Sequence, residues 1–180
     1  MGVWFDSGMR MTSDVIEIRD KTTGIIQHLT RITPNIGGPR VEKRRLLASV
    51  VHSTILYASP IWDRSMRFKH YENMLERINR KLALRVASAY CTCPTVAVLC
   101  LVKIHPVSLL IQERNQIYKN GPFFRKEARN MVLEQWQTRW EAYSGWTKTF
   151  IPNIKNWIKC DQVNTDYYLT QAMTGHGVVG

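Results

Sequence analysis

Residues 65–89 read SMRFKHYENMLERINRKLALRVASA, a stretch in which apolar and charged side chains recur with a helical period. Its apolar positions lie three or four residues apart, at Phe68, Tyr71, Leu75, Ile78 and Leu82. This spacing places them on one face of an α-helix, because about 3.6 residues complete one turn. The sequence therefore predicts a long amphipathic helix over residues 65–89.

Two further helices are predicted upstream of this stretch. The first includes residues 15–32 and can be capped by Ser13 or Asp14. The second covers residues 41–58, and Pro60 is expected to end it. Its expected buried face consists of Leu46, Leu47, Val50, Val51, Thr54 and Ile55.

Downstream, Pro94 and Pro106 each suit the first turn of another helix. Residues 120–122 (NGP) predict a break, and a last helix is expected from the spacing of Phe124, Ala128, Val132, Trp136 and Trp140. Residues 2–6 read as a short strand, but no second strand pattern follows within hairpin distance. The predicted fold class is mainly α, with one short N-terminal strand.

The chain is strongly basic, with 25 Lys and Arg against 14 Asp and Glu and a net charge of +11. Such a balance favours a polyanionic partner. Two clusters stand at the start of the second helix and along the third, and their members are Arg40, Lys43, Arg44 and Arg45, and Arg77, Arg80, Lys81 and Arg85. Basic stripes of this kind can follow a phosphate backbone without reading its sequence. We therefore expect these eight residues to bind nucleic acid, although either cluster alone would also suit a solvated helix face.

Four cysteines make no disulfide framework in 180 residues, so a reducing compartment, cytosol or nucleus, is expected. Residues 1–10 do not read as a secretory signal, and no apolar run is long enough to predict a membrane span. The pair Cys91 and Cys93 lacks the spacing of a zinc site and is better interpreted as free thiols. A nucleophilic pair from Cys100 and His105 is formally possible, but nothing in the sequence orients it.

A two-metal polymerase site needs carboxylates that lie a few ångströms apart. The six aspartates are scattered along the chain, no two of them are adjacent, and no comparable cluster of acids and histidines suggests an endonuclease. From its residues alone, the chain is interpreted as a binding or structural module with no catalytic residue and no metal ligand.

Several stretches resemble reverse transcriptases of non-LTR retrotransposons, particularly the type-one elements that insert into insect ribosomal RNA genes. Residues 1–6 (MGVWFD) are similar to the strand that closes the palm before the thumb, and residues 47–62 (LASVVHSTILYASPIW) to the thumb helix that ends in Leu-Tyr-Gly-x-x-x-Trp. The blocks that follow in the same order are 78–81 (INRK), 85–92 (RVASAYCT), 99–113, 136–140 (WQTRW), 145–147 (GWT), 151–152 (IP) and 170–177 (TQAMTGHG).

The resemblance implies the end of the palm and the thumb over residues 1–90, a helical connection over 91–120, and a post-thumb region over 121–180. For the whole polyprotein it implies RNA-directed DNA polymerase and endonuclease activities, with Mg²⁺ as cofactor. The implied partners are an RNA template with its DNA primer and, through the whole protein, chromosomal target DNA. The family's paired aspartates and zinc knuckle match nothing in this sequence, so no cofactor is assigned to these residues, and His176 is interpreted as structural.

Two other functions stay open at the level of the sequence. One is a freestanding basic helical RNA-binding protein, and the other is a small enzyme that uses Cys100 and His105. An open reading frame that continues upstream into a palm motif would separate the first of these from the reverse transcriptase.

Overall fold

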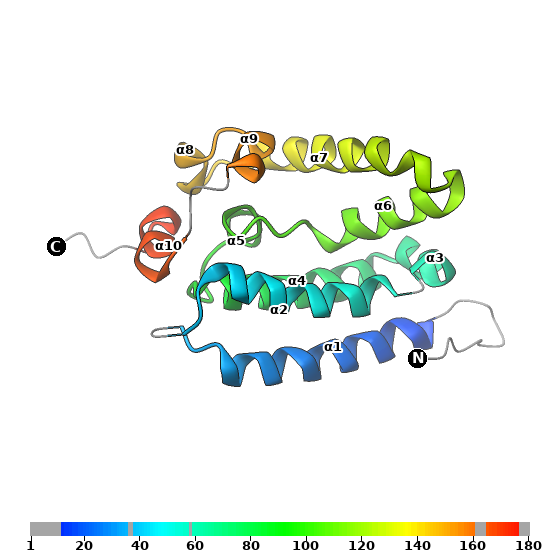
Figure 1. The fold of residues 1–180 in the computed structure, drawn as a ribbon, viewed down its shortest axis with the longest axis horizontal. Coiled ribbons are helices and arrows are strands. Elements are labelled where there is room, and N and C mark those ends of the chain that lie inside the picture. Colours follow the sequence, from blue (N-terminus) through cyan, green and yellow to red (C-terminus); the bar gives the residue numbers. More distant parts are fainter. Residues whose placement is uncertain (1–11, 36–37, 58, 161–164, 177–180) are drawn as a thin grey trace.

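The computed structural model describes residues 12–35, 38–57, 59–160 and 165–176, which form a layered array of helices (Figure 1). The α-helices are α1 (Thr12–Ile32), α2 (Val41–Leu56), α3 (Ser59–Trp62), α4 (Lys69–Ala87), α5 (Thr95–Leu101), α6 (Val107–Asn120), α7 (Arg125–Glu141), α8 (Thr147–Phe150), α9 (Ile154–Lys159) and α10 (Tyr167–Thr174). Two 3-10 helices, η1 (Asp63–Arg67) and η2 (Pro122–Phe124), precede α4 and α7. These described residues contain no strand, so the mainly α fold class is confirmed, while the strand predicted at residues 2–6 lies outside them.

The layers follow the chain from one edge of the molecule to the other. In Figure 1, α1 forms one edge, α2 lies in front of α4, α6 comes next, and α7 forms the opposite edge. The contacts agree with this view, since α4 packs against α1, α2, α5 and α6, and α6 packs against α7. The central helix of the array is thus α4, the segment whose pattern is most clearly helical in the sequence. Among the described residues, none of the helices combines the length and the hydropathy that a membrane-spanning segment requires.

The helix boundaries differ from the prediction around the second and third helices. α2 ends at Leu56, and Pro60 lies inside the short α3, where its missing N–H is tolerated in the first turn. The indole Nε1 of Trp62 donates to the main-chain oxygen of Tyr57 over 3.2 Å and closes this turn. α4 begins at Lys69, because Phe68 before it has an extended backbone; its ring is 52% exposed and does not belong to the apolar face as predicted.

The predicted buried face of α2 was partly wrong. Val51, Thr54 and Ile55 are buried as expected, but Leu46 is 71% exposed and Val50 is 48% exposed. The buried stripe is displaced around the helix and consists of Val41, Arg44, Ala48, Val51, Thr54 and Ile55. A charged residue occupies this stripe because its guanidinium group finds main-chain oxygens there, which a hydrophobicity pattern does not register.

The described residues form two apolar cores, and both include side chains of α5. The first is formed by α1 to α5 with the residues that follow α5, and includes Val15, Val51, Ile55, Trp62, Leu75 and Leu82. The second joins α5 and α6 to the C-terminal helices and includes Leu101, Leu109, Trp136, Trp140, Ile151 and Ile154. Because α5 contributes to both, the C-terminal helices are packed onto the N-terminal ones.

Trp140, Trp146 and Trp157 of the C-terminal region each donate their indole N–H to a main-chain oxygen. Trp140 has no exposed surface, and its Nε1 donates to the main-chain oxygen of Ile151 over 2.7 Å. Trp157 donates in the same way to Cys100 over 2.9 Å, and Trp146 to Ala172 over 3.1 Å. Each bond joins segments that are distant in the sequence, so these indoles hold the short helices in place.

Candidate nucleic-acid interface

A groove lies between α1 and α4, with a volume of about 360 Å³. Its lining residues are Arg19, Thr23, His70, Asn73, Met74, Arg77, Ile78 and Lys81. The helical period explains the arrangement, because Arg77 and Lys81 are four residues apart on α4, as Arg19 and Thr23 are on α1. We call this site the α1–α4 groove.

The charge of the α1–α4 groove is positive, since Arg19, Arg77 and Lys81 line it and no acidic residue does. Arg77 and Lys81 are both exposed. Arg19 forms a two-point ion pair with its neighbour Asp20, at 2.8 Å and 3.0 Å, and this hydrogen bonding lowers the pKa of Asp20. An exposed ion pair of this kind is weak in water, so Arg19 can exchange the Asp20 carboxylate for a phosphate.

Arg44, predicted as a nucleic-acid contact, is built into the fold. It is 5% exposed, and burial lowers the pKa of its guanidinium group, as does the charge of Arg85. Its three nitrogens donate to the main-chain oxygens of Pro39 at 2.7 Å, Arg85 at 3.1 Å and Pro34 at 2.5 Å. The side chain thus joins the segment before α2 to the end of α4.

Two residues of the second cluster, Arg80 and Arg85, also donate within the chain. Arg80 donates to the oxygens of Cys91 at 2.6 Å and Cys93 at 2.7 Å, and to the Thr95 hydroxyl at 2.9 Å. Arg85 donates to the Asn35 side chain at 2.9 Å and to the main-chain oxygen of Thr33 at 3.3 Å. Both guanidinium groups hold loops against α4.

The remaining predicted residues do not form one site. Arg77 and Lys81 lie in the α1–α4 groove, whereas Arg40 lines a different cavity of about 440 Å³ beside Tyr167 of α10. Lys43 is exposed on the first turn of α2, and Arg45 is half-buried. The two sequence clusters meet where Arg44 donates to the main-chain oxygen of Arg85.

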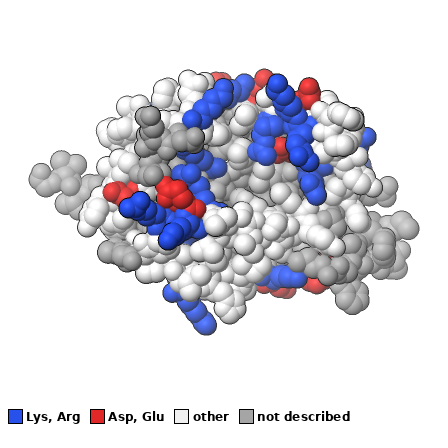
Figure 2. All heavy atoms as spheres, viewed as in Figure 1, with Lys and Arg blue, Asp and Glu red and all other residues white. Residues whose placement is uncertain are grey.

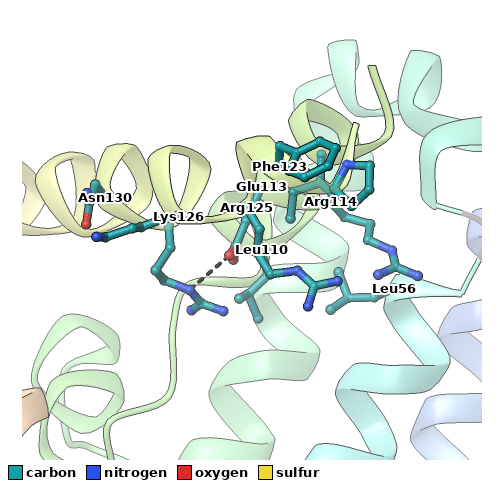
Figure 3. A pocket seen from close by; sticks show the side chains of 11 residues that line it. Leu56, Leu110, Glu113, Arg114, Phe123, Arg125, Lys126 and Asn130 are labelled. Atoms are coloured by element: carbon teal, nitrogen blue, oxygen red, sulfur yellow. Dashed lines mark ion pairs between the residues drawn. The ribbon is translucent and has the colours of Figure 1, made fainter. Parts of the chain in front are cut away.

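A second basic cavity, which was not predicted from the sequence, lies between α6 and α7 and has a volume of about 760 Å³ (Figure 3). Four basic side chains line it, namely Arg114, Arg125, Lys126 and Arg129. A signal for it exists, because five basic residues stand within residues 114–129, on both sides of the aromatic pair Phe123 and Phe124. That pattern is split by the break at residues 120–122, and the fold brings its halves face to face.

The Cys100 and His105 pair is not arranged for nucleophilic catalysis. Cys100 has no exposed surface, and burial raises the pKa of its thiol to about 12. Burial also lowers the pKa of His105 to about 3, helped by the charges of Arg129 and His52. The imidazole accepts from Arg129 over 3.1 Å and lies against Trp136. Within the described ranges, no three His, Cys, Asp or Glu side chains come together as metal ligands.

His52 and His176 both have hydrogen-bond partners within the fold, and a structural role was predicted for His176 from the sequence. His52 Nε2 donates to the Asn79 side-chain oxygen over 2.9 Å, and Asn79 in turn donates to the main-chain oxygen of His105. His176 contacts the hydroxyls of Thr92 at 2.7 Å and Thr174 at 3.1 Å.

The chain is similar to a known polyprotein. Over an alignment 202 positions long, it is 24% identical to the retrovirus-related Pol polyprotein from the type-1 retrotransposable element R1 4 of Nasonia vitripennis. The alignment covers 98% of this chain and 50% of the relative, so the chain spans about half of the relative's length. No family model matches the chain, and no solved structure does. The similarity confirms the resemblance found in the motifs: in sequence, this chain is related to the Pol polyprotein of a type-1 retrotransposable element.

Proposed function

We propose that the chain is the thumb and post-thumb part of a non-LTR retrotransposon reverse transcriptase, and that it binds the RNA template–DNA primer duplex through phosphates. The observation that carries the proposal is the α1–α4 groove, which presents Arg19, Arg77 and Lys81 with no acidic residue in its lining. The groove lies within residues 1–90, the range in which the resemblance to the family implies a thumb.

The chemistry of the groove favours contact with a backbone rather than with bases. Lys and Arg side chains on two packed helices can neutralise successive phosphates and release condensed counterions. Contacts of this kind fix the position of a duplex but carry little sequence information. A polymerase that moves along its template needs such sequence-tolerant binding.

The catalytic activities belong, in this proposal, to the whole Pol polyprotein. They are RNA-directed DNA polymerase with Mg²⁺ and endonuclease acting on chromosomal target DNA. Residues 91–120 connect the thumb to a post-thumb region over 121–180. This part of the polyprotein contributes binding, because none of its aspartates pair in the sequence as a two-metal site requires.

The test is the salt dependence of binding to an RNA–DNA hybrid duplex, measured by fluorescence anisotropy with the 180-residue chain. The double variant Arg77→Gln/Lys81→Gln should reduce the slope of log K against log salt by about 0.7–0.9 for each phosphate that the variant no longer neutralises. The control Lys155→Gln/Lys159→Gln removes the same charge from α9 and should leave the slope nearly unchanged. Equal slopes for wild type and the Arg77→Gln/Lys81→Gln variant would refute the proposal.

A further inference from the structure

The cavity between α6 and α7 has a different construction from the α1–α4 groove. α6 and α7 pack against each other, and η2 connects them, so the cavity opens at the turn of a helical hairpin. Apolar walls come from Leu56, Leu110, Ile117 and Pro122, with the basic side chains around them. Figure 2 shows Lys and Arg gathered on the face where this hairpin turns in Figure 1. We call this site the α6–α7 cavity.

The acid in the lining, Glu113, is already neutralised. Its Oε1 pairs with Nε of Arg129 over 2.9 Å, and its side chain is 7% exposed. Burial raises the pKa of Glu113, and the charges of the neighbouring Arg129 and Arg125 oppose this increase. Arg129 also donates to His105, so both members of the pair are fixed by the surrounding structure.

The other three cations of the α6–α7 cavity are available to a ligand. Within the described part of the chain, Arg114, Arg125 and Lys126 form no hydrogen bond or ion pair, and all three are exposed. Figure 3 shows the guanidinium groups of Arg114 and Arg125 pointing to the same side, above Leu56, while Lys126 extends toward Asn130. Because Glu113 is already paired with Arg129, these three cations can together bind an anionic ligand that has more than one negative charge.

Phe123 adds a flat apolar surface to this site. It is 97% exposed, more than any other large hydrophobic residue of the described ranges. It stands in the short η2, between Gly121, with φ +86°, and Arg125, the first residue of α7, so the turn that carries it is sharply defined. An exposed aromatic ring next to unpaired cations is the arrangement that binds a nucleobase and its phosphates together.

We propose that the α6–α7 cavity binds single-stranded nucleic acid, with a base stacked on Phe123 and the adjoining phosphates on Arg114, Arg125 and Lys126. The volume of about 760 Å³ falls within the range of small-molecule sites and can receive an unpaired nucleotide. Bases inside a duplex are stacked on both faces, so the ring cannot insert beside them as it can beside an unpaired base. This site goes beyond the duplex binding proposed for the α1–α4 groove and lies on other helices.

The experiment compares a short oligouridine with a blunt RNA–DNA duplex, both measured by anisotropy against the 180-residue chain. Phe123→Ala should weaken oligouridine binding by about 5- to 150-fold, the loss expected for one stacked base, and leave duplex binding unchanged. Arg114→Gln/Arg125→Gln should weaken the same ligand and reduce its salt dependence. Tyr118→Ala is the matched control, because Tyr118 is 74% exposed on α6 and does not line the cavity.

Photocrosslinking supplies a second measurement that does not depend on affinity. An oligonucleotide with 5-iodouridine should crosslink to the peptide that contains Phe123. Wild-type affinity of the Phe123→Ala variant, equal losses for strand and duplex, or a crosslink that maps elsewhere would each overturn the proposal. Stronger competition by a phosphorylated peptide than by oligouridine would also overturn it. If instead the α1–α4 groove does not bind the duplex, the result is a different one: Arg77→Gln/Lys81→Gln leaves duplex binding intact.

Discussion

The Arg44 guanidinium group donates to the main-chain oxygen of Arg85 over 3.1 Å, which joins the start of α2 to the end of α4. Both residues belong to the basic clusters that the sequence offers for nucleic-acid binding. Arg85 itself donates to Asn35 and Thr33, at the far end of α1. Three helices therefore meet through arginines whose hydrogen bonds are made inside the protein, and basic residues of one cluster have different roles.

Arg44→Gln should destabilise the fold by about 2–3 kcal/mol, because it buries a neutral side chain in place of the guanidinium group and leaves the carbonyl oxygens of Pro34, Pro39 and Arg85 without their charged donor. Arg77→Gln should change the free energy of unfolding by less than about 0.5 kcal/mol, as is usual for an exposed site. Urea unfolding monitored by circular dichroism measures both. Equal effects of the two substitutions would contradict a structural role for Arg44.

The helices of this fold could largely be predicted from the sequence, whereas the use of each arginine could not. Periodicity identified α4 and most of α7 because their apolar faces pack on one side. It misplaced Leu46 and Val50, since the buried stripe of α2 includes Arg44, which a hydrophobicity pattern counts as exposed. Burial of a guanidinium depends on carbonyl oxygens from distant segments, and sequence spacing does not contain that information.

The two basic sites show the same limit. Arg77 and Lys81 could be grouped from one helix, but Arg19 joins them only because α1 packs on α4. The α6–α7 cavity draws Arg114 from one helix and Arg125 from the next, across a break. A linear sequence reveals stripes on single helices more readily than sites shared between two.

Stability should decrease as the pH falls through the range set by His105. Burial lowers the pKa of this group from its ordinary 6.5 to about 3, so between these values the unfolded chain binds a proton that the folded chain does not. The free energy of unfolding should therefore drop by up to about 1.4 kcal/mol per pH unit from this group as the pH falls below about 6.5. His52, whose pKa burial also lowers, contributes in the same direction.

Urea unfolding at a series of pH values between about 4 and about 7 measures this dependence. His105→Gln should flatten the slope in this window, whereas His28→Gln, a change at an exposed position of α1, should leave it as in wild type. A wild-type slope in the His105→Gln variant would show that the histidine is not held neutral in the fold.

The four thiols should react in the order of their exposure. All four cysteines are free; Cys91 is exposed, Cys160 is half-buried, and Cys93 and Cys100 are buried. Burial raises the pKa of Cys93 to about 11 and of Cys100 to about 12, so neither forms the reactive thiolate near neutral pH.

Iodoacetamide at neutral pH should therefore modify Cys91 first, and Cys100 only after denaturant is added, as followed by peptide mass spectrometry. Cys91→Ser removes the fast phase and serves as the control. Modification of Cys100 in the folded chain at the rate of Cys91 would restore the hypothesis of a catalytic cysteine next to His105.

Among the described helices, α4 and α10 each end with a residue in the left-handed conformation. This residue is a serine in α4 and a glycine in α10. α4 ends at Ser88, with φ 54° and ψ 33°, and α10 ends at Gly175, with φ 77° and ψ 15°. A residue with a Cβ is strained there by about 1–2 kcal/mol, and glycine is not. Part of this advantage is lost again, because glycine makes the unfolded chain more flexible.

Ser88→Gly should consequently stabilise the fold by about 0.5–1 kcal/mol, and Gly175→Ala should destabilise it by a similar amount. A Cβ at Gly175 would meet Trp146 at 3.5 Å, an ordinary contact, so the effect there comes from the backbone alone. At Ser88 the main-chain oxygen accepts from Gln171 over 3.0 Å, which keeps the conformation unchanged in the variant. Thermal unfolding should show shifts of about 2 °C in opposite directions. Shifts of the same sign, or a loss of stability in Ser88→Gly larger than in Ser88→Ala, would mean that the Ser88 side chain matters more than its backbone angle.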